Sequence, residues 1–103
     1  MDELELVAFD IISNVGMGKS LAIEAIREAK KGNYIESDKK IDEAKEYLLN
    51  GHHAHAKLIQ KEATGEKIEF SLIMMHAEDQ LISAETVKDL AVEIIDICKE
   101  KLK

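Results

Sequence analysis

Ionisable residues lie in the most apolar part of this 103-residue chain. The segment from Leu72 to Ile82 contains His76 and Asp79, and Asp79 falls in a helically spaced apolar series directly after Met75. A buried carboxylate without a partner takes up a proton or destabilises the fold, so Asp79 needs a compensating group. The candidates are His76, three residues earlier on a nearby helix face, and a Lys or His of a neighbouring helix.

The other three histidines, His52, His53 and His55, lie close together in the sequence. Neutral imidazole is a common metal ligand, and His52 and His55 are one helical turn apart, so they share a face. His53 points elsewhere, which prevents the three rings from converging from a single helix. Two interpretations stay open: a metal site completed by a carboxylate such as Glu62, and polar positions partly exposed on a helix surface.

Two further candidates are better explained by structure than by chemistry. Gly18-Lys19-Ser20 resembles the end of a phosphate-binding loop, but the first glycine of that pattern would fall at Ser13, and no hydrophobic strand precedes it. We interpret it as a chance match, with Gly16 and Gly18 loosening the middle of a helix at a cost of about 1 kcal/mol each. Cys98, the only cysteine, is expected in the core, and a single cysteine excludes an internal disulfide framework.

The composition is typical of one packed, soluble domain spanning residues 1–103. Apolar residues make up 46% of the chain and charged residues 34%, and the net charge of -7 comes without a basic cluster, which argues against nucleic acid as a partner. The uninterrupted apolar stretches are much shorter than the roughly 20 residues of a membrane span, and the N-terminus is acidic. We therefore expect a cytoplasmic protein without direct membrane insertion.

The chain has no proline, and its glycines divide it into three helical segments. Asp2 and Glu5 form a capping-box pattern that opens a helix over about 2–31, and further helices are predicted over about 34–63 and from about 67 to the end. Because the connections are short, the predicted fold is all-α, an antiparallel up-down-up three-helix bundle.

Apolar residues at helical spacing predict the core of this bundle. In the first two segments the predicted core positions are Leu4, Val7, Ile11, Val15, Ala22, Ile26, Ala29, Ile41, Ala44, Leu48, Ile59 and Ala63. The third segment is apolar on more than one side, through residues that include Leu72, Ile73, Met74, Met75, Leu81, Ile82, Leu90, Ile94, Ile95 and Ile97. Two slender neighbouring helices cannot cover all of these side chains. A second buried face, and hence self-association, follows as a hypothesis.

At this third segment the sequence resembles the lactose/cellobiose-type (also diacetylchitobiose) enzyme IIA family of the bacterial phosphoenolpyruvate-dependent sugar phosphotransferase system. The resemblance covers nearly the whole chain and rests on Ser20-Leu21-Ala22 with Glu24-Ala25, on Leu58-Ile59-Gln60-Lys61-Glu62-Ala63-Thr64-Gly65, and on His76-Ala77 with Asp79. These segments fall in all three predicted helices.

The resemblance implies a homotrimer of three-helix bundles that acts as a phosphocarrier. His76 matches the phosphorylated histidine, and Asp79 matches the aspartate that meets its symmetry mates at one metal ion per trimer, Mg²⁺, on the threefold axis. The implied donor is the histidine-containing phosphocarrier protein, and the implied acceptor is a cysteine of the cognate IIB protein or domain. The implied pathway is uptake of a β-glucoside or galactoside disaccharide, which IIA proteins do not themselves bind.

Departures from the family pattern lie near the site. Glu78 and Gln80 stand where the family has Gln and His, and His55 and Ala56 stand where it has Gln and Thr. A glutamate at position 78 is expected to repel an incoming phosphate, and a histidine at position 55 is a candidate to restore a donor. The alternative function is a non-catalytic helical oligomeric interaction or regulatory protein on the same scaffold, and phosphorylation of His76 separates the two.

Overall fold

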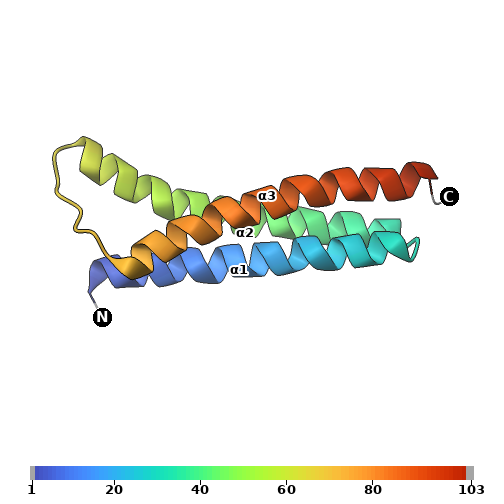
Figure 1. Cartoon of the computed structure of the whole chain (residues 1–103), viewed down its shortest axis with the longest axis horizontal. Coiled ribbons are helices and arrows are strands. Elements are labelled where there is room, and N and C mark those ends of the chain that lie inside the picture. Colours follow the sequence, from blue (N-terminus) through green and yellow to red (C-terminus); the bar gives the residue numbers. More distant parts are fainter. Residues whose placement is uncertain (1, 102–103) are drawn as a thin grey trace.

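The computed structural model describes residues 2–101 and consists of three long helices. They are α1 (Glu3–Lys30), α2 (Tyr34–Ala63) and α3 (Leu72–Lys101), and together they form a rod of 54 × 24 × 18 Å. Helices α1 and α3 run in the same direction and α2 runs against them (Figure 1). Within the described residues all regular secondary structure is helical. The predicted all-α, up-down-up bundle is confirmed.

The first two helices begin and end close to where the sequence predicts. The Asp2 carboxylate caps α1 by accepting a hydrogen bond from the Glu5 amide at 2.8 Å, which satisfies one of the free N–H groups of the first turn. Glu3 and Glu5 place negative charge at the same positive end of the helix dipole. The chain leaves α1 through Gly32, whose φ of 84° suits glycine, and α2 follows at Tyr34.

Helix α3 begins at Leu72, about five residues later than predicted. The Ser71 hydroxyl accepts a hydrogen bond from the Met74 amide at 3.1 Å, and the Ser71 carbonyl accepts one from the Met75 amide at 3.1 Å, so Ser71 caps the helix. The preceding residues, 66–71, form an irregular connection. This connection contains no glycine or proline, so its composition does not reveal that the backbone leaves the helical conformation there.

Two clusters of buried residues fill the bundle, one towards each end. The first contains Ala8, Ile11, Val15, Leu48, Leu58, Met74, Ala77, Leu81 and Ala84. The second contains Leu21, Ala22, Ala25, Ala29, Ile41, Ala44, Ala91, Ile95 and Cys98. Most predicted core positions lie in or against these clusters, but Ile59 and Ala63 are exposed. The buried face of α2 follows a seven-residue spacing that reaches Leu58 instead, as in coiled-coil packing.

Close approach of α1 and α2 depends on glycine. A Cβ atom added at Gly18 would lie 2.9 Å from Leu48 Cδ2, and one added at Gly51 would lie 2.7 Å from Val15 Cγ1. Gly18 therefore has a packing role that the sequence does not predict, because this glycine is buried at the contact between the helices. At Gly16 an added Cβ would meet nothing within 4 Å.

At the opposite end of the bundle from Ser71, polar contacts join the helices. The buried Ser37 hydroxyl on α2 donates a 2.7 Å hydrogen bond to the Ala25 carbonyl on α1. Lys99 on α3 forms an ion pair of 2.7 Å with Asp38 on α2, and this hydrogen bond raises the pKa of the Lys99 ammonium. These contacts hold all three helices together far along the rod from residue 76.

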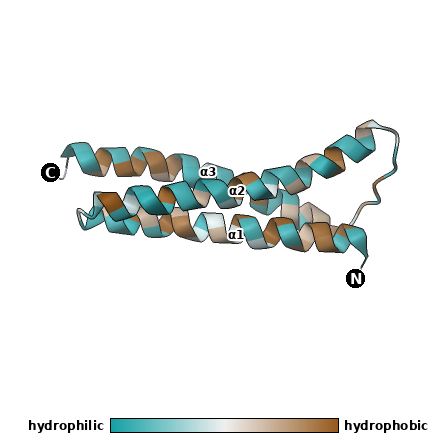
Figure 2. Ribbon diagram, turned by 180° about the vertical axis from the view of Figure 1, so that it is seen from behind, coloured by the Kyte–Doolittle hydropathy of each residue, from teal (hydrophilic) through white to brown (hydrophobic). Residues whose placement is uncertain are grey.

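Helix α1 is long enough and apolar enough, by length and composition alone, to cross a membrane. The uninterrupted apolar stretches of the sequence do not predict this, because each of them is much shorter than a membrane span. Of the most apolar window of α1, 33% is buried in the bundle, and the buried residues of the whole helix are Ala8, Ile11, Val15, Gly18, Leu21, Ala22, Ala25 and Ala29. Apolar and polar residues alternate along the helices in Figure 2, as expected of amphipathic helices in a bundle.

Candidate functional site

His76 lies in the second turn of α3 and is exposed. It follows Leu72 by four residues and precedes Asp79 by three, so these three side chains are neighbours along one side of the helix. An exposed imidazole on a regular helix is accessible to a partner protein and is held at a fixed position. The ring is therefore available as a nucleophile.

Large apolar side chains remain exposed on one side of α3. They are Leu72, Met75, Ile82, Leu90, Ile94 and Ile97. Their spacing of three, four and seven or eight residues places them on a single stripe, which we call the outer face of α3. The opposite side of the helix carries the buried residues that contact the rest of the bundle. The sequence prediction of two apolar sides on this helix is thus confirmed, and the second side is uncovered in a single chain.

Asp79 lies within the outer face, between Met75 and Ile82 along the helix, and is exposed in the single chain. The structure shows no hydrogen bond or ion pair from Asp79 to His76 or to any other residue between positions 2 and 101. Pairing with a Lys or His of a neighbouring helix, one of the alternatives considered from the sequence, is therefore not observed. A second molecule that covers the outer face would bury this carboxylate and leave it in need of a partner.

A metal ion does not have a complete set of ligands in one chain. Among the described residues, no group of three or more His, Cys, Asp or Glu side chains comes together to hold an ion. Asp79 nevertheless fits the implied metal, because its exposed carboxylate supplies a hard oxygen donor. Such donors suit Mg²⁺ when several subunits contribute them.

Two of the three histidines of α2 lie beside acidic residues of α3. His52 Nε2 lies 2.8 Å from Glu85 Oε1, and His55 Nε2 lies 3.3 Å from Glu78 Oε1. His53, in contrast, lines a shallow depression on the α1 side together with Asp10. The structure thus places His53 apart from His52 and His55, as their spacing predicts, and it pairs the latter two with glutamates across the α2–α3 contact.

The remaining sequence candidates have structural roles. Gly18-Lys19-Ser20 lies inside the continuous helix α1 instead of in a loop, so its amides are not free to bind a phosphate. Lys19 Nζ donates a 3.3 Å hydrogen bond to Ser83 Oγ on α3. Cys98 is buried in the second core cluster, as predicted.

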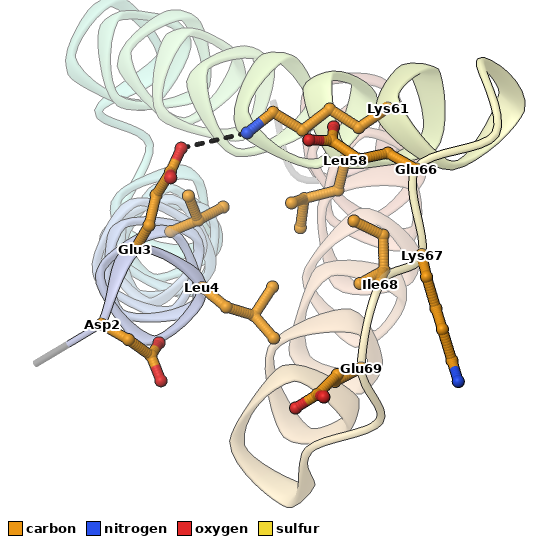
Figure 3. A pocket seen from close by; sticks show the side chains of 10 residues that line it. Asp2, Glu3, Leu4, Leu58, Lys61, Glu66, Lys67, Ile68 and Glu69 are labelled. Carbon is orange, nitrogen blue, oxygen red and sulfur yellow. Dashed lines mark hydrogen bonds and ion pairs between the residues drawn. The ribbon is translucent and has the colours of Figure 1, made fainter.

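An open cleft of about 290 Å³ lies where α2 diverges from the N-terminal ends of α1 and α3. Figure 3 shows Leu4, Leu58 and Ile68 on its inner surface, with the ion pair between Lys61 and Glu3 at 3.0 Å across one side. Its lining includes neither His76 nor Asp79. The candidate site is therefore the convex outer face of α3 and not a cavity.

Comparison with known proteins gives a consistent result. A family model described as "PTS system, Lactose/Cellobiose specific IIA subunit" matches residues 6–99. The chain is 49% identical over 96 residues to the lichenan-specific phosphotransferase enzyme IIA component of Bacillus subtilis, which covers 93% of this chain and 87% of the relative. It is 33% identical over 99 residues to the lactose-specific EIIA component of Staphylococcus epidermidis, with 96% and 95% covered.

Solved structures agree with the sequence matches. The cellobiose-specific enzyme IIA from Bacillus anthracis superimposes with a TM-score of 0.94 at 44% identity and covers 97% of this chain and 92% of that one. The chitobiose IIA in a complex with HPr, from the diacetylchitobiose branch of the Escherichia coli phosphotransferase system, superimposes with a TM-score of 0.86 at 29% identity over the full length of both chains.

Proposed function

The chain belongs to the lactose/cellobiose-specific IIA family of the phosphotransferase system, and from this we propose that it is a cytoplasmic phosphocarrier whose acceptor residue is His76. The observation that carries the proposal is the position of His76. It is an exposed histidine at the edge of the apolar outer face of α3, in the segment that resembles the family's phosphorylated site. His52 and His55 instead lie beside glutamates of the same chain.

The proposed reaction consists of two phosphoryl transfers. In the first, the lone pair of a neutral His76 imidazole nitrogen attacks the phosphorus of a phosphohistidine on the donor, so that a new N–P bond forms while the donor's N–P bond breaks. In the second, the thiolate of a cysteine on the IIB component attacks the same phosphorus, and His76 is released as neutral imidazole. Each step conserves the phosphoryl group, so the protein ends each cycle unchanged.

Positioning accounts for most of what this chain contributes to the transfer. His76 is held on a helix of 30 residues whose opposite side is anchored in the first core cluster by Met74 and Ala77. A fixed imidazole loses little freedom when the donor docks. Leu72 and Met75 lie beside it on the outer face of α3, where their apolar side chains exclude water from one flank of the imidazole during transfer.

We further propose that the outer faces of three copies meet in a homotrimer. A cyclic assembly would bury the apolar stripe and bring one Asp79 carboxylate from each subunit together at the axis. Three converging carboxylates repel each other unless a cation compensates them, and Mg²⁺, one per trimer, is the proposed ion. The metal would supply charge compensation for the assembly.

The partners follow from the relatives. The chitobiose IIA was solved in complex with HPr, which supports the histidine-containing phosphocarrier protein as the donor for this chain, and family membership supports a cognate IIB component as the acceptor. The relatives are named for lichenan, galactose, cellobiose and lactose, among other sugars, so the proposed pathway is uptake of a β-glucoside or galactoside disaccharide.

The experiment is reconstitution of the two transfers. The purified protein is incubated with phosphoenolpyruvate, the general transfer enzyme and the histidine-containing phosphocarrier protein, and labelled phosphate is followed first onto this chain and then onto a IIB component. We expect stoichiometric labelling that is lost when a IIB acceptor is added. A folded protein that no competent donor labels would favour the non-catalytic interaction protein.

A further inference from the structure

Two residues that depart from the family pattern contact each other. His55 on α2 lies with its Nε2 atom 3.3 Å from Glu78 Oε1 on α3. The His55 nitrogen is shielded from solvent and has no well-directed hydrogen bond, so the nearby carboxylate is its electrostatic partner. The Glu78 side chain is still 48% exposed, and the His55 side chain is 24% exposed. The carboxylate of Glu78 thus lies at the protein surface with the imidazole of His55 behind it.

Glu78 and His76 flank opposite edges of the outer face. His76 is one turn from Leu72, and Glu78 is one turn from Ile82 on the side nearer α2. Two residues of separation correspond to about 160° around an α-helix. Glu78 therefore points away from the imidazole of its own chain, although it lies at nearly the same height along the helix.

A cyclic assembly changes this relationship. When identical subunits pack around an axis through the outer faces of α3, one edge of each face meets the opposite edge of the next subunit. Because the helices are then parallel and in register, the edge that carries His76 meets the edge that carries Glu78 of the neighbouring copy. The site for the phosphoryl group is then shared by two subunits.

We propose that His55 is a positioning residue for phosphoryl transfer: it holds and compensates Glu78 so that this carboxylate does not repel the phosphoryl group on His76 of the adjacent subunit. The inference rests on the proposed function and on the proposed cyclic trimer. An uncompensated carboxylate near a dianionic phosphoryl group opposes transfer, whereas an imidazole beside that carboxylate draws its charge back towards α2. His55 acts through Glu78 and does not touch the phosphoryl group.

The test is a double-mutant cycle on the initial rate of labelling by the phosphorylated phosphocarrier protein. Removal of His55 by His55→Gln leaves Glu78 uncompensated, and the rate should fall roughly fivefold, as expected for one partly exposed charge pair. Glu78→Gln removes the repelling charge and should not slow labelling. In the double variant, His55→Gln should then have no effect beyond that of Glu78→Gln alone. Lys99→Gln breaks an α2–α3 ion pair far along the bundle and should leave the rate unchanged.

Mixed trimers test the contact between subunits. One wild-type subunit is assembled with an excess of differently tagged His76→Ala subunits, which cannot be labelled, or with His55→Gln/His76→Ala subunits. We expect labelling of the wild-type chain to slow roughly fivefold only with the second partner, because its neighbour then presents an uncompensated Glu78.

Several outcomes would overturn the inference. Equal slowing by His55→Gln in the wild-type background and in the Glu78→Gln background would mean that His55 acts structurally, and unchanged labelling in His55→Gln would mean that it plays no part. A wild-type chain that slows identically with both partners in mixed trimers would exclude the contact between subunits. Each of these results leaves labelling of wild-type His76 intact and hence the proposed function. Absence of wild-type labelling would overturn both.

Discussion

Gly18 of α1 packs directly against Leu48 of α2. The contact is so close that a Cβ atom at position 18 would lie 2.9 Å from both Leu48 Cγ and Cδ2 and 3.2 Å from the carbonyl oxygen of Ala44. Leu48 is almost fully buried and cannot move freely. The short distance between α1 and α2 in the middle of the bundle therefore depends on the absence of a side chain at position 18.

Replacing Gly18 with Ala should destabilise the protein by about 1–3 kcal/mol, because the added methyl group overpacks the core between α1 and α2. Gly16→Ala is the matched control. The space around Gly16 is open, so the same substitution two residues earlier should stabilise the helix by about 0.5–1 kcal/mol. Chemical denaturation of both variants at one protein concentration measures their free energies of unfolding. Equal changes in the two variants would show that α1 and α2 do not pack as closely at Gly18 as the structure indicates.

The role of Gly18 also shows where sequence reasoning fails. Helical periodicity predicts Ile11, Val15 and Leu48 as core, because a repeating apolar face is a local property of the chain. Periodicity does not show which glycine will pack against another helix, because this contact depends on how the helices are arranged in space. In the same way, the sequence reveals the outer face of α3 as an apolar excess but not the contact between His55 and Glu78.

The bounds of α3 and the end of α2 illustrate two other causes of error. The capping role of Ser71 is a single-residue signal within a segment that contains no glycine or proline, so the predicted helix starts too early. Ile59 fits an ideal helical repeat counted from Leu48, but the seven-residue packing of α2 buries Leu58 instead. The ideal helical repeat and the seven-residue packing repeat differ slightly, and the difference accumulates along the 30 residues of α2.

Ile82→Glu should dissociate the proposed trimer. Ile82 is 69% exposed on the outer face of α3 in a single chain, and three glutamates buried around an axis would each lack a partner. Ile59→Glu changes a side chain of similar exposure, 54%, on α2 and should leave the assembly intact. Sedimentation equilibrium should give about three times 11.6 kDa for the wild type and for Ile59→Glu. A wild type that stays monomeric at micromolar concentration would contradict the proposed interface.

Replacing Asp79 with Leu should leave a folded trimer with a higher melting temperature. The substitution removes three converging charges and adds apolar side chains of similar volume to the interface. A chelator should lower the melting temperature of the wild type by removing the compensating ion, and it should not affect the Leu variant. The same response to chelator in both proteins, measured at equal concentration, would place Asp79 away from a metal ion.

Labelling rates test whether the apolar surface beside His76 excludes water from the transfer. Leu72 is 75% exposed in a single chain, and Leu72→Gln should reduce the rate of labelling by the phosphocarrier protein roughly fivefold or more, since a polar side chain beside the imidazole no longer excludes water as well. The melting temperature should also fall, because the substitution places a polar group in the proposed interface between subunits. An unaltered rate would indicate that Leu72 does not shield the site of transfer.

The central claim, that His76 alone carries the phosphoryl group, is tested most directly by labelling of variants that each lack one histidine. The wild type should acquire an acid-labile, base-stable phosphate from the phosphorylated phosphocarrier protein, and His76→Ala should acquire none while keeping its helical circular dichroism, since alanine is well tolerated at an exposed helical position. His53→Ala, which changes another exposed histidine, should be labelled as the wild type is. Labelling that persists in His76→Ala and disappears in His55→Ala would contradict the assignment.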